Sequence, residues 1–187
     1  MLSIRQLTPL DASAVRTLRL SALRESPTAF GKSYNEEIVE PLTETEKRLA
    51  NNLGSVLLGA FINDALVGTV GIRRESMQKL AHKAGLWGMY VAPPHRGHGV
   101  ARQLVTEALA VAATFGGVRQ VTLYVNAVNI GAIALYESLG FVTYGVEPCG
   151  MCVDGVFYDE HLMVNVLAAG NINSAARATA QTTKQRA

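Results

Sequence analysis

The segment Val91-Ala-Pro-Pro-His-Arg-Gly-His-Gly-Val-Ala-Arg102 decides the fold of this chain. The apolar residues 85–91 predict a strand that ends at this segment. Residues 99–115 predict a helix, because apolar side chains recur there at helical spacing: Val100, Leu104, Ala108, Val111 and Phe115. Gly97 and Gly99 lie at the junction, where glycine lets backbone N–H groups approach a phosphate and the helix N-terminus adds positive charge. The segment therefore predicts an anion-binding loop between a strand and a helix.

This loop differs from two common nucleotide-binding loops. Gly97 and Gly99 fit the start of a dinucleotide-binding fingerprint, but Arg102 stands where its third glycine belongs. A Walker A loop is excluded for this segment because no Gly-Lys-Ser or Gly-Lys-Thr occurs in it. On this segment alone, a plain glycine turn ahead of a helix remains the alternative.

The remaining chain is predicted to alternate strands with helices. Strands are expected over residues 2–7, 55–62, 66–72, 118–126, 141–146 and 156–167, with a turn at Asn63-Asp64. Helices are expected from Asp11 to Ser26-Pro27 and over 129–139, with short helical pieces broken at Pro41. The last two strands are expected to be separated by a loop that contains Cys149, Cys152 and Asp154-Gly155. This order predicts a mixed α/β sheet with helices on its faces.

A second pattern lies downstream, Asn126-x-x-Asn129-x-x-Ala132-x-x-Leu135-Tyr136-x-x-x-Gly140-Phe141. Asn129 and Tyr136 are seven residues apart, so on a helix they share one face two turns apart. An N-cap asparagine and a core tyrosine are the alternative interpretation of the same residues. Together with Arg96-x-x-Gly99-x-Ala101, the pattern resembles the two signatures of the GCN5-related N-acetyltransferase (GNAT) superfamily, over about residues 2–167.

The resemblance implies an α/β fold of the GNAT type, a mixed, mostly antiparallel central sheet of about seven strands flanked by helices on both faces. It also implies acetyl-CoA as a cosubstrate and no metal. The residues expected to contact acetyl-CoA come from the strand before the loop, the loop itself and the helix after the next strand: Met89, Tyr90, Val91, Arg96, Gly97, His98, Gly99, Val100, Ala101, Asn129 and Tyr136.

Tyr136 is the catalytic residue that the resemblance implies, because its hydroxyl would point at the thioester sulfur and protonate the departing thiolate. The acceptor amine must be neutral, yet an alkylammonium has a pKa near about 10, so a base or a lowered pKa is required. The base positions used in parts of the family are not filled: Tyr124 stands at one, and no acid lies near Gly85 at the other. The alternatives are a water relay or one of four side chains: Glu36, Glu37, Glu75 and His82.

The charge distribution argues against a nucleic-acid partner. The chain carries 17 basic and 15 acidic residues, a formal net charge of +2. Three of the basic residues lie after residue 167, where there is no acid, so the rest of the chain has 14 basic and 15 acidic residues. Nucleic-acid binders usually carry a basic stripe on the folded domain itself. We therefore expect no nucleic-acid partner, and the resemblance implies a small-molecule amine as the acceptor.

A length of 187 residues is typical of one domain with a tail. We expect an acetyltransferase domain over 1–167 and a disordered tail over 168–187, where apolar periodicity is lost. The apolar run Val56–Ile62 is far shorter than the roughly 18 residues of a membrane helix. No basic segment followed by an apolar one opens the chain. We therefore expect a cytoplasmic protein with no membrane partner, either a monomer or a homodimer.

The cysteines and histidines do not predict a metal site. Cys149 and Cys152 supply two ligands, and His161 is predicted inside a strand and not at ligand spacing. His95 and His98 are interpreted as loop residues near the phosphates. We expect no metal in the site.

Six glutamates between residues 25 and 46 form an acidic stretch, which would steer a cationic amine toward the protein or simply form a solvated polar face. The prediction is an acetyl-CoA-dependent N-acetyltransferase that acts on a primary amine, expected to be small and cationic, by direct attack in a ternary complex. The alternatives are a protein N-terminal or lysine acetyltransferase, and a non-catalytic acyl-CoA-binding regulatory module.

Overall fold

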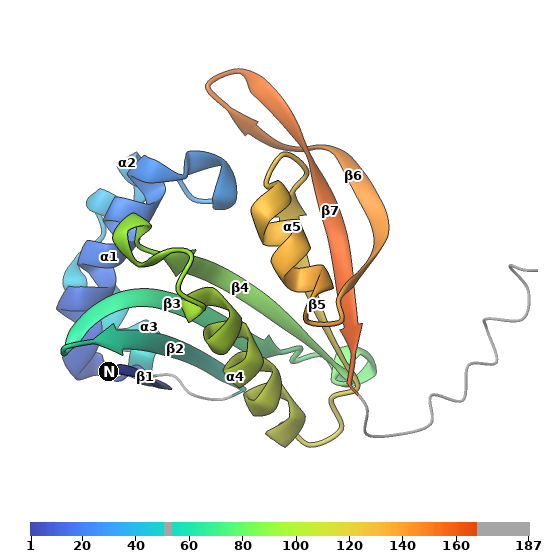
Figure 1. Cartoon of the computed structure of the whole chain (residues 1–187), viewed down its shortest axis with the longest axis horizontal. Coiled ribbons are helices and arrows are strands. Elements are labelled where there is room, and N and C mark those ends of the chain that lie inside the picture. Colours follow the sequence, from blue (N-terminus) through green and yellow to red (C-terminus); the bar gives the residue numbers. More distant parts are fainter. Residues whose placement is uncertain (51–53, 168–187) are drawn as a thin grey trace, which may run out of the picture.

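The computed structural model describes residues 1–50 and 54–167, so the tail expected over 168–187 lies outside the described residues. A seven-stranded sheet with the order β1-β2-β3-β4-β5-β7-β6 forms the centre of the fold (Figure 1). Of its six strand pairs, β4–β5 is parallel and the other five are antiparallel. The predicted mixed, mostly antiparallel sheet is confirmed. Its strands are β1 (Leu2–Gln6), β2 (Ser55–Ile62), β3 (Ala65–Arg74), β4 (Lys83–Val91), β5 (Gln120–Asn126), β6 (Val142–Val153) and β7 (Val156–Val166).

Helices cover both faces of the sheet, as expected. α1 and α3 pack on one face, and α4 crosses the opposite face (Figure 1). Pro41 separates the short helices α2 and α3, which confirms the predicted break. The α-helices are α1 (Ala12–Glu25), α2 (Tyr34–Ile38), α3 (Leu42–Ala50), α4 (Val100–Thr114) and α5 (Ile130–Glu137), joined in part by the 3₁₀ turns η1 (Pro9–Asp11), η2 (Pro27–Ala29), η3 (Gln78–Leu80) and η4 (Pro93–His95).

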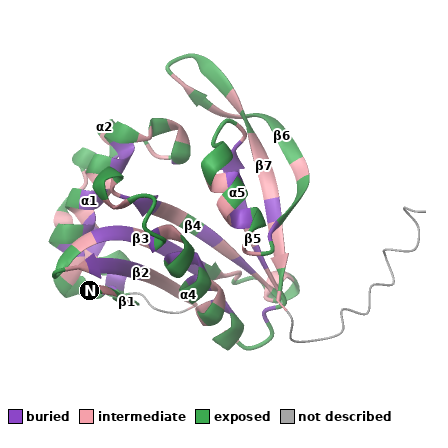
Figure 2. Cartoon of the chain, in the orientation of Figure 1, coloured by how far each residue is buried: buried purple, intermediate pink, exposed green. Residues whose placement is uncertain are grey.

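The main core lies between α4 and the sheet. The inward side of α4 is buried and its outward side is exposed (Figure 2). The buried positions of α4 are Val100, Leu104, Val105, Ala108 and Ala112, whereas Val111 and Phe115 of the predicted stripe are only partly buried. Burial of this stripe anchors the N-terminus of α4 beside the end of β4, because helix and strand share one core.

Two tight turns consist of residue types that favour the left-handed backbone conformation. Asn63 and Asp64 join β2 to β3 with φ values of 48° and 64°, and Asp154 and Gly155 join β6 to β7 with φ values of 50° and 78°. Both pairs adopt the left-handed conformation that two-residue hairpin turns require, which explains the choice of Asn, Asp and Gly.

The prediction of a loop around the two cysteines is wrong. β6 continues to Val153, so Cys149 and Cys152 lie in a strand, where both are free and exposed. The register of β6 against β7 shifts between Glu147 and Met151, and the Cys149 amide donates to Asp159 Oδ1 at 2.9 Å. Pro148 and Gly150 are loop signals in the sequence, but a β-bulge in an edge strand accommodates both of them.

Candidate active site

Strands β4 and β5 are paired at one end and separate at the other. Their ladder consists of Lys83↔Gln120, Ala84↔Val121 and Gly85↔Thr122. Beyond this ladder β4 runs on to Val91 and β5 to Asn126 without pairing with each other, and the two arms diverge (Figure 1). The backbone N–H and C=O groups that face this gap are therefore free to bind a ligand.

A bulge interrupts β4 inside the gap. The register against β3 shifts between the pairs Thr69↔Tyr90 and Gly71↔Trp87. Gly88, which lies between these pairs on β4, has a φ of +61°, a conformation that glycine adopts without strain. Bulges bend a strand and re-aim its backbone groups, and they are common beside active sites. No pattern in the sequence predicts a bulge at this glycine.

The predicted anion-binding loop follows β4 directly. Gly97 and Gly99 have φ values of +77° and +79°, and a Cβ added at either position would meet no other atom within 4 Å. Gly99 is the N-cap of α4, and the first turn of α4 carries no acidic residue. The backbone donors at this helix end thus have open space in front of them and no competing carboxylate, which suits a phosphate group.

Arg96 uses its donors to hold the loop in place. Its Nε donates to the Val91 carbonyl at 2.8 Å, and its Nη1 and Nη2 donate to Glu25 Oε1 and Oε2 at 3.0 Å and 2.6 Å. The hydrogen bonds from Arg96 lower the pKa of Glu25, which keeps the carboxylate charged. The guanidinium therefore ties the loop to the ends of β4 and α1.

The second motif lies along α5, on the β5 side of the gap. The Asn129 side chain caps α5 by accepting from the Ala132 amide at 3.1 Å. Tyr136 is 5% exposed, and its ring packs edge-on against Phe141 with a centroid distance of 5.7 Å. Burial raises the pKa of Tyr136 to about 12, so the phenol stays protonated at neutral pH. Both residues thus have the structural roles of cap and core residue, and both remain available for a second role.

Further contacts, which the sequence did not predict, connect the two sides of the gap. Arg102 of α4 donates to Ser138 Oγ, just after α5, at 2.8 Å. Asn126, which is buried at the end of β5, donates through Nδ2 to the Thr28 carbonyl at 3.2 Å and accepts from the Val128 amide at 3.0 Å. Asn126 thereby fixes the end of β5 to η2, on the same side as α1.

A cavity of about 120 Å³ opens beside the bulge, between α1, α3 and the face of β2–β4. One water needs about 10–15 Å³ of such volume, so the cavity has room for a small organic molecule. Its lining includes Gly88, Trp87 and Thr69 from β3 and β4, and charged side chains from the helices: Arg16, Arg19, Glu37 and Arg48.

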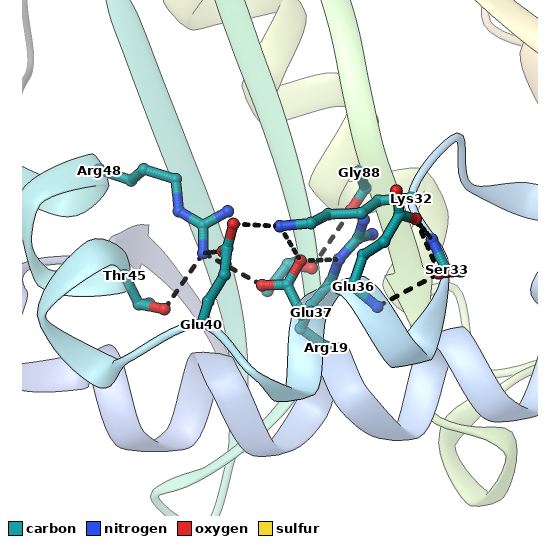
Figure 3. A network of polar contacts seen from close by, with 10 residues as sticks. Arg19, Lys32, Ser33, Glu36, Glu37, Glu40, Thr45, Arg48 and Gly88 are labelled. Atoms are coloured by element: carbon teal, nitrogen blue, oxygen red, sulfur yellow. Dashed lines mark hydrogen bonds and ion pairs between the residues drawn. The ribbon is translucent and has the colours of Figure 1, made fainter.

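Glu37 is the centre of an ion-pair network at this cavity (Figure 3). Its side chain is 3% exposed, and its oxygens lie 3.1 Å from Arg48, 3.3 Å from Lys32 and 3.9 Å from Arg19. Burial opposes ionisation of Glu37, but Arg48 and Lys32 outweigh this effect and lower its pKa. Glu37 is therefore an ionised carboxylate at neutral pH.

Among the four side chains considered as bases, Glu37 alone lines this cavity. Glu36 is committed to capping α2, since it accepts from the amide and the hydroxyl of Ser33, both at 2.7 Å. Glu75 and His82 lie at the closed end of the gap, where the Glu75 amide donates to the Lys83 carbonyl and the His82 carbonyl accepts from the Arg119 amide. The sequence could not separate these four, because three-dimensional placement distinguishes them.

The acidic stretch is largely neutralised by neighbouring basic residues. Glu40 pairs with Lys32 and Arg48, and Glu44 pairs with Lys47. Together with the pairs of Glu25 and Glu37, these contacts remove most of the negative potential that the sequence suggested. Within residues 1–50 and 54–167, no group of three or more His, Cys, Asp or Glu side chains is placed to hold a metal ion, and no helix is long and apolar enough to cross a membrane.

A comparison with models of known protein families identifies the family of this chain. The model of the Acetyltransferase (GNAT) family matches residues 19–141, and the chain belongs to this family. The match extends from α1 to Phe141 and thus contains both predicted motifs. The predicted superfamily, and with it the class of acyltransferase, is confirmed.

Known proteins agree with this assignment. A spermidine N(1)-acetyltransferase of Vibrio cholerae is 31% identical over 125 residues, which cover 66% of this chain and 72% of that protein. An uncharacterised protein of Mycobacterium leprae is 36% identical over 112 residues, which cover 58% of this chain and 28% of that protein. The crystal structure of a GNAT-family acetyltransferase from Streptococcus pneumoniae superposes with a TM-score of 0.82 at 26% identity, covering 89% of this chain and all of that one.

Proposed function

We propose that this protein transfers an acetyl group from acetyl-CoA to a small primary amine by direct attack in a ternary complex. The observation that carries the proposal is the position of the Gly88 bulge. It lies in the gap between β4 and β5, close in sequence to the glycine loop, and it also lines the cavity of about 120 Å³. One backbone segment therefore faces both a place for acetyl-CoA and a place for a small acceptor. The name of the Vibrio cholerae relative, an acetyltransferase of an amine, agrees with this choice.

The residues around the gap fit acetyl-CoA. The amides of Gly97 to Ala101 would bind the pyrophosphate, with His98 and Val100 in the same loop and Arg96 holding its shape. The unpaired backbone groups of Met89, Tyr90 and Val91 would bind the amide groups of the pantetheine arm. Asn129 and Tyr136 would contact the arm from α5. Acetyl-CoA supplies the acetyl group as a thioester, which an amine can attack directly.

The chain supplies stabilisation for both charges that develop. A backbone N–H of β4 after the bulge, at Met89 or Tyr90, would donate to the carbonyl oxygen as it gains negative charge. Tyr136 would give its proton to the sulfur as the C–S bond breaks, and it would recover a proton from solvent. Because the pKa of Tyr136 is about 12, the side chain holds the proton it must donate.

The acceptor must lose a proton as its nitrogen forms the new C–N bond. Glu37 is close to the bulge, but its lowered pKa makes it a weak base. We therefore assign proton removal to water in the cavity, and we assign to Glu37 the binding of the amine before it reacts. Steering of a polycation by an acidic rim has little support, because four of the six acids of that stretch, Glu25, Glu37, Glu40 and Glu44, are ion-paired.

Steady-state assays with acetyl-CoA and a panel of amines and peptides test the proposal. We expect release of CoA thiol in equal amount to an N-acetylated small amine, with peptides used much less efficiently. Efficient acetylation of peptide N-termini or lysines would favour a protein acetyltransferase. Binding of acetyl-CoA without thiol release for any amine or peptide would show a regulatory module and would contradict the proposal.

A further inference from the structure

The cavity at Gly88 carries an excess of positive charge. Its lining holds three arginines, Arg16, Arg19 and Arg48, and one carboxylate, Glu37. Lys32 and Glu40, which are ion-paired with these groups, add one charge of each sign at its edge. We call these six residues the basic cluster. Because four of the side chains are basic and two are acidic, the cluster keeps two positive charges in excess, which disfavours a polycationic acceptor.

Arg19 is the cation of this cluster whose hydrogen-bond donors are not used. Its contacts in the described part of the chain are an ion pair with Glu37 Oε2 at 3.9 Å and the face of the Phe30 ring at 4.4 Å. Neither distance is that of a hydrogen bond. Burial lowers the pKa of Arg19, so its charge lacks part of the compensation that water would give. An anion in the cavity would supply both the missing acceptor and the missing charge.

The other two arginines of the lining are already engaged. Arg16 donates to the Ile38 carbonyl at 2.8 Å. Arg48 donates to Glu37 Oε1 at 3.1 Å and to Thr45 Oγ1 at 3.2 Å. These bonds hold α1, α2 and α3 together around the cavity. Arg19 differs from them because it lines the cavity and its guanidinium donates no hydrogen bond to the described residues.

Glu37 has one oxygen that can still accept a hydrogen bond. Its side chain is 3% exposed, and Oε2 is buried without a hydrogen-bond partner among the described residues. Buried carboxylate oxygens are usually hydrogen-bonded, whereas Oε2 has only ion pairs, with Lys32 Nζ at 3.3 Å and Arg19 Nε at 3.9 Å, so a donor on a ligand would complete its contacts. A donor such as an amine N–H satisfies it. Arg19 and Glu37 Oε2 are thus ion-paired with each other at 3.9 Å, but neither makes a hydrogen bond within the described residues.

We propose that the acceptor carries a carboxylate on the same small skeleton as its amine, as an amino acid does, and that Arg19 binds this carboxylate. The inference rests on the proposed acetyl transfer and adds the class of amine. A planar guanidinium binds a carboxylate through two parallel hydrogen bonds, which gives both charge and shape selectivity. Glu37 Oε2 accepts from the amine end of the same molecule. Arg19 is therefore a specificity-determining residue.

Matched sets of acceptors test the inference with the wild-type protein. Common amino acids are each compared with their carboxamide and with the amine that lacks the carboxylate, and spermidine is included as a polycation. We expect kcat/KM to be at least about 100-fold higher for the member that carries the carboxylate, because its absence leaves Arg19 unpaired in the cavity. Equal or better use of the carboxamide, the simple amine or spermidine would overturn the inference and leave acetyl transfer intact.

Variants of Arg19 separate recognition from folding. In Arg19→Met, we expect KM for the carboxylate acceptor to rise by about 100-fold while kcat/KM for the simple amine stays within about threefold, so the ratio between them collapses. Arg19→Lys keeps the positive charge but not the paired donors of the guanidinium, so it should recover part of the preference for the carboxylate acceptor. The matched control is Arg24→Met, on the same helix, whose guanidinium lies over Tyr34 and does not line the cavity. An equal loss for both acceptors in Arg19→Met, with none in the control, would show a merely structural role and would overturn the assignment.

Failure of the inference and failure of the proposed function give different results. If acetyl-CoA binds but no amine of any kind is acetylated, the proposed function is wrong and the inference falls with it. If amines are acetylated without regard to a carboxylate, only the inference is wrong. Binding of acetyl-CoA by calorimetry in every variant shows that each of them is folded.

Discussion

Arg96 and Glu25, which are 71 residues apart in the chain, form a two-pronged ion pair with N···O distances of 3.0 Å and 2.6 Å. The pair joins the glycine loop to the end of α1. Since α1 also lines the acceptor cavity, the same contact connects the proposed acetyl-CoA site with the acceptor side of the protein. The resemblance implies that Arg96 contacts acetyl-CoA, and from these contacts we propose that it positions the loop.

A double-mutant cycle on this pair tests the role of Arg96. Exposed pairs of this kind contribute about 0.2–1 kcal/mol, so Glu25→Gln should weaken acetyl-CoA binding by less than about fivefold. If Arg96 acts through Glu25, then Arg96→Ala should have little further effect in the Glu25→Gln background. Isothermal titration calorimetry measures all four affinities, with Glu44→Gln as a control on α3. An equal effect of Arg96→Ala in both backgrounds would contradict a role through Glu25 and would leave the Val91 contact or direct contact with the cosubstrate as the cause.

Gly99→Val should abolish acetyl-CoA binding, because a branched side chain would fill the open space in front of the helix N-terminus. Strain at the φ of +79° could produce the same loss without any effect on the ligand. Gly117→Val is the matched control: its φ is +84°, it lies after the other end of α4, and its added Cβ would meet only Arg74 at 3.9 Å. We expect calorimetry to show normal affinity in the control. Near-normal affinity in a folded Gly99→Val protein would contradict the loop assignment.

Tyr136→Phe should reduce turnover by about 10²–10⁴-fold, the usual range for loss of a general acid. Phenylalanine keeps the ring that packs against Phe141, so the melting temperature and the acetyl-CoA affinity should change little. The rate is measured in a single turnover as well as at steady state, because product release can hide the chemical step. Tyr34→Phe, outside the gap, controls for loss of a hydroxyl. An effect below about fivefold in the single turnover would rule out the acid role.

The hydrogen bonds of Asp11 should make the stability of the protein depend on pH. The bidentate hydrogen bonds from Arg5, at 2.8 Å and 2.7 Å, and the Thr8 amide hold the pKa of Asp11 well below its usual range. A lowered folded-state pKa stabilises the protein above the unfolded value of about 3.9 and loses this effect as pH falls below it. Asp11→Asn should therefore be less stable by about 1 kcal/mol at pH 7, with the difference shrinking below about pH 4.

Urea unfolding at pH 7 and below about pH 4 measures the difference in stability between wild type and Asp11→Asn. Asp64→Asn serves as the control, since Asn suits that hairpin turn as well as Asp does. A stability difference between wild type and Asp11→Asn that stays the same at low pH would contradict the role assigned to the ion pair with Arg5.

The sequence predicted the parts of the fold that depend on local pattern. Apolar periodicity located α4, and the Asn63-Asp64 pair located the turn between β2 and β3, because each of these signals is local in the sequence. The motifs around Gly99 and Tyr136 likewise named the family, since both are contiguous in sequence.

Features that depend on distant contacts could not be predicted. The Gly88 bulge is defined by its register against β3, and the partner of Arg96 lies on α1. Pro148 and Gly150 are compatible with a loop or with a bulged edge strand, and pairing with β7 decides between them. The cluster of charges around Glu37 comes from three helices and the segments beside α2, so the acidic composition of that stretch did not reveal the arginines that surround it.

Direct transfer of the acetyl group at the β4 bulge is tested most directly by a single-turnover experiment with label in the acetyl group. Excess protein is mixed with labelled acetyl-CoA and an amine acceptor, and the label is followed on protein, amine and free acetate. We predict that the label passes to the amine nitrogen in step with release of CoA thiol, without a labelled protein species. Label that accumulates on the protein, or that appears only as free acetate, would contradict the account.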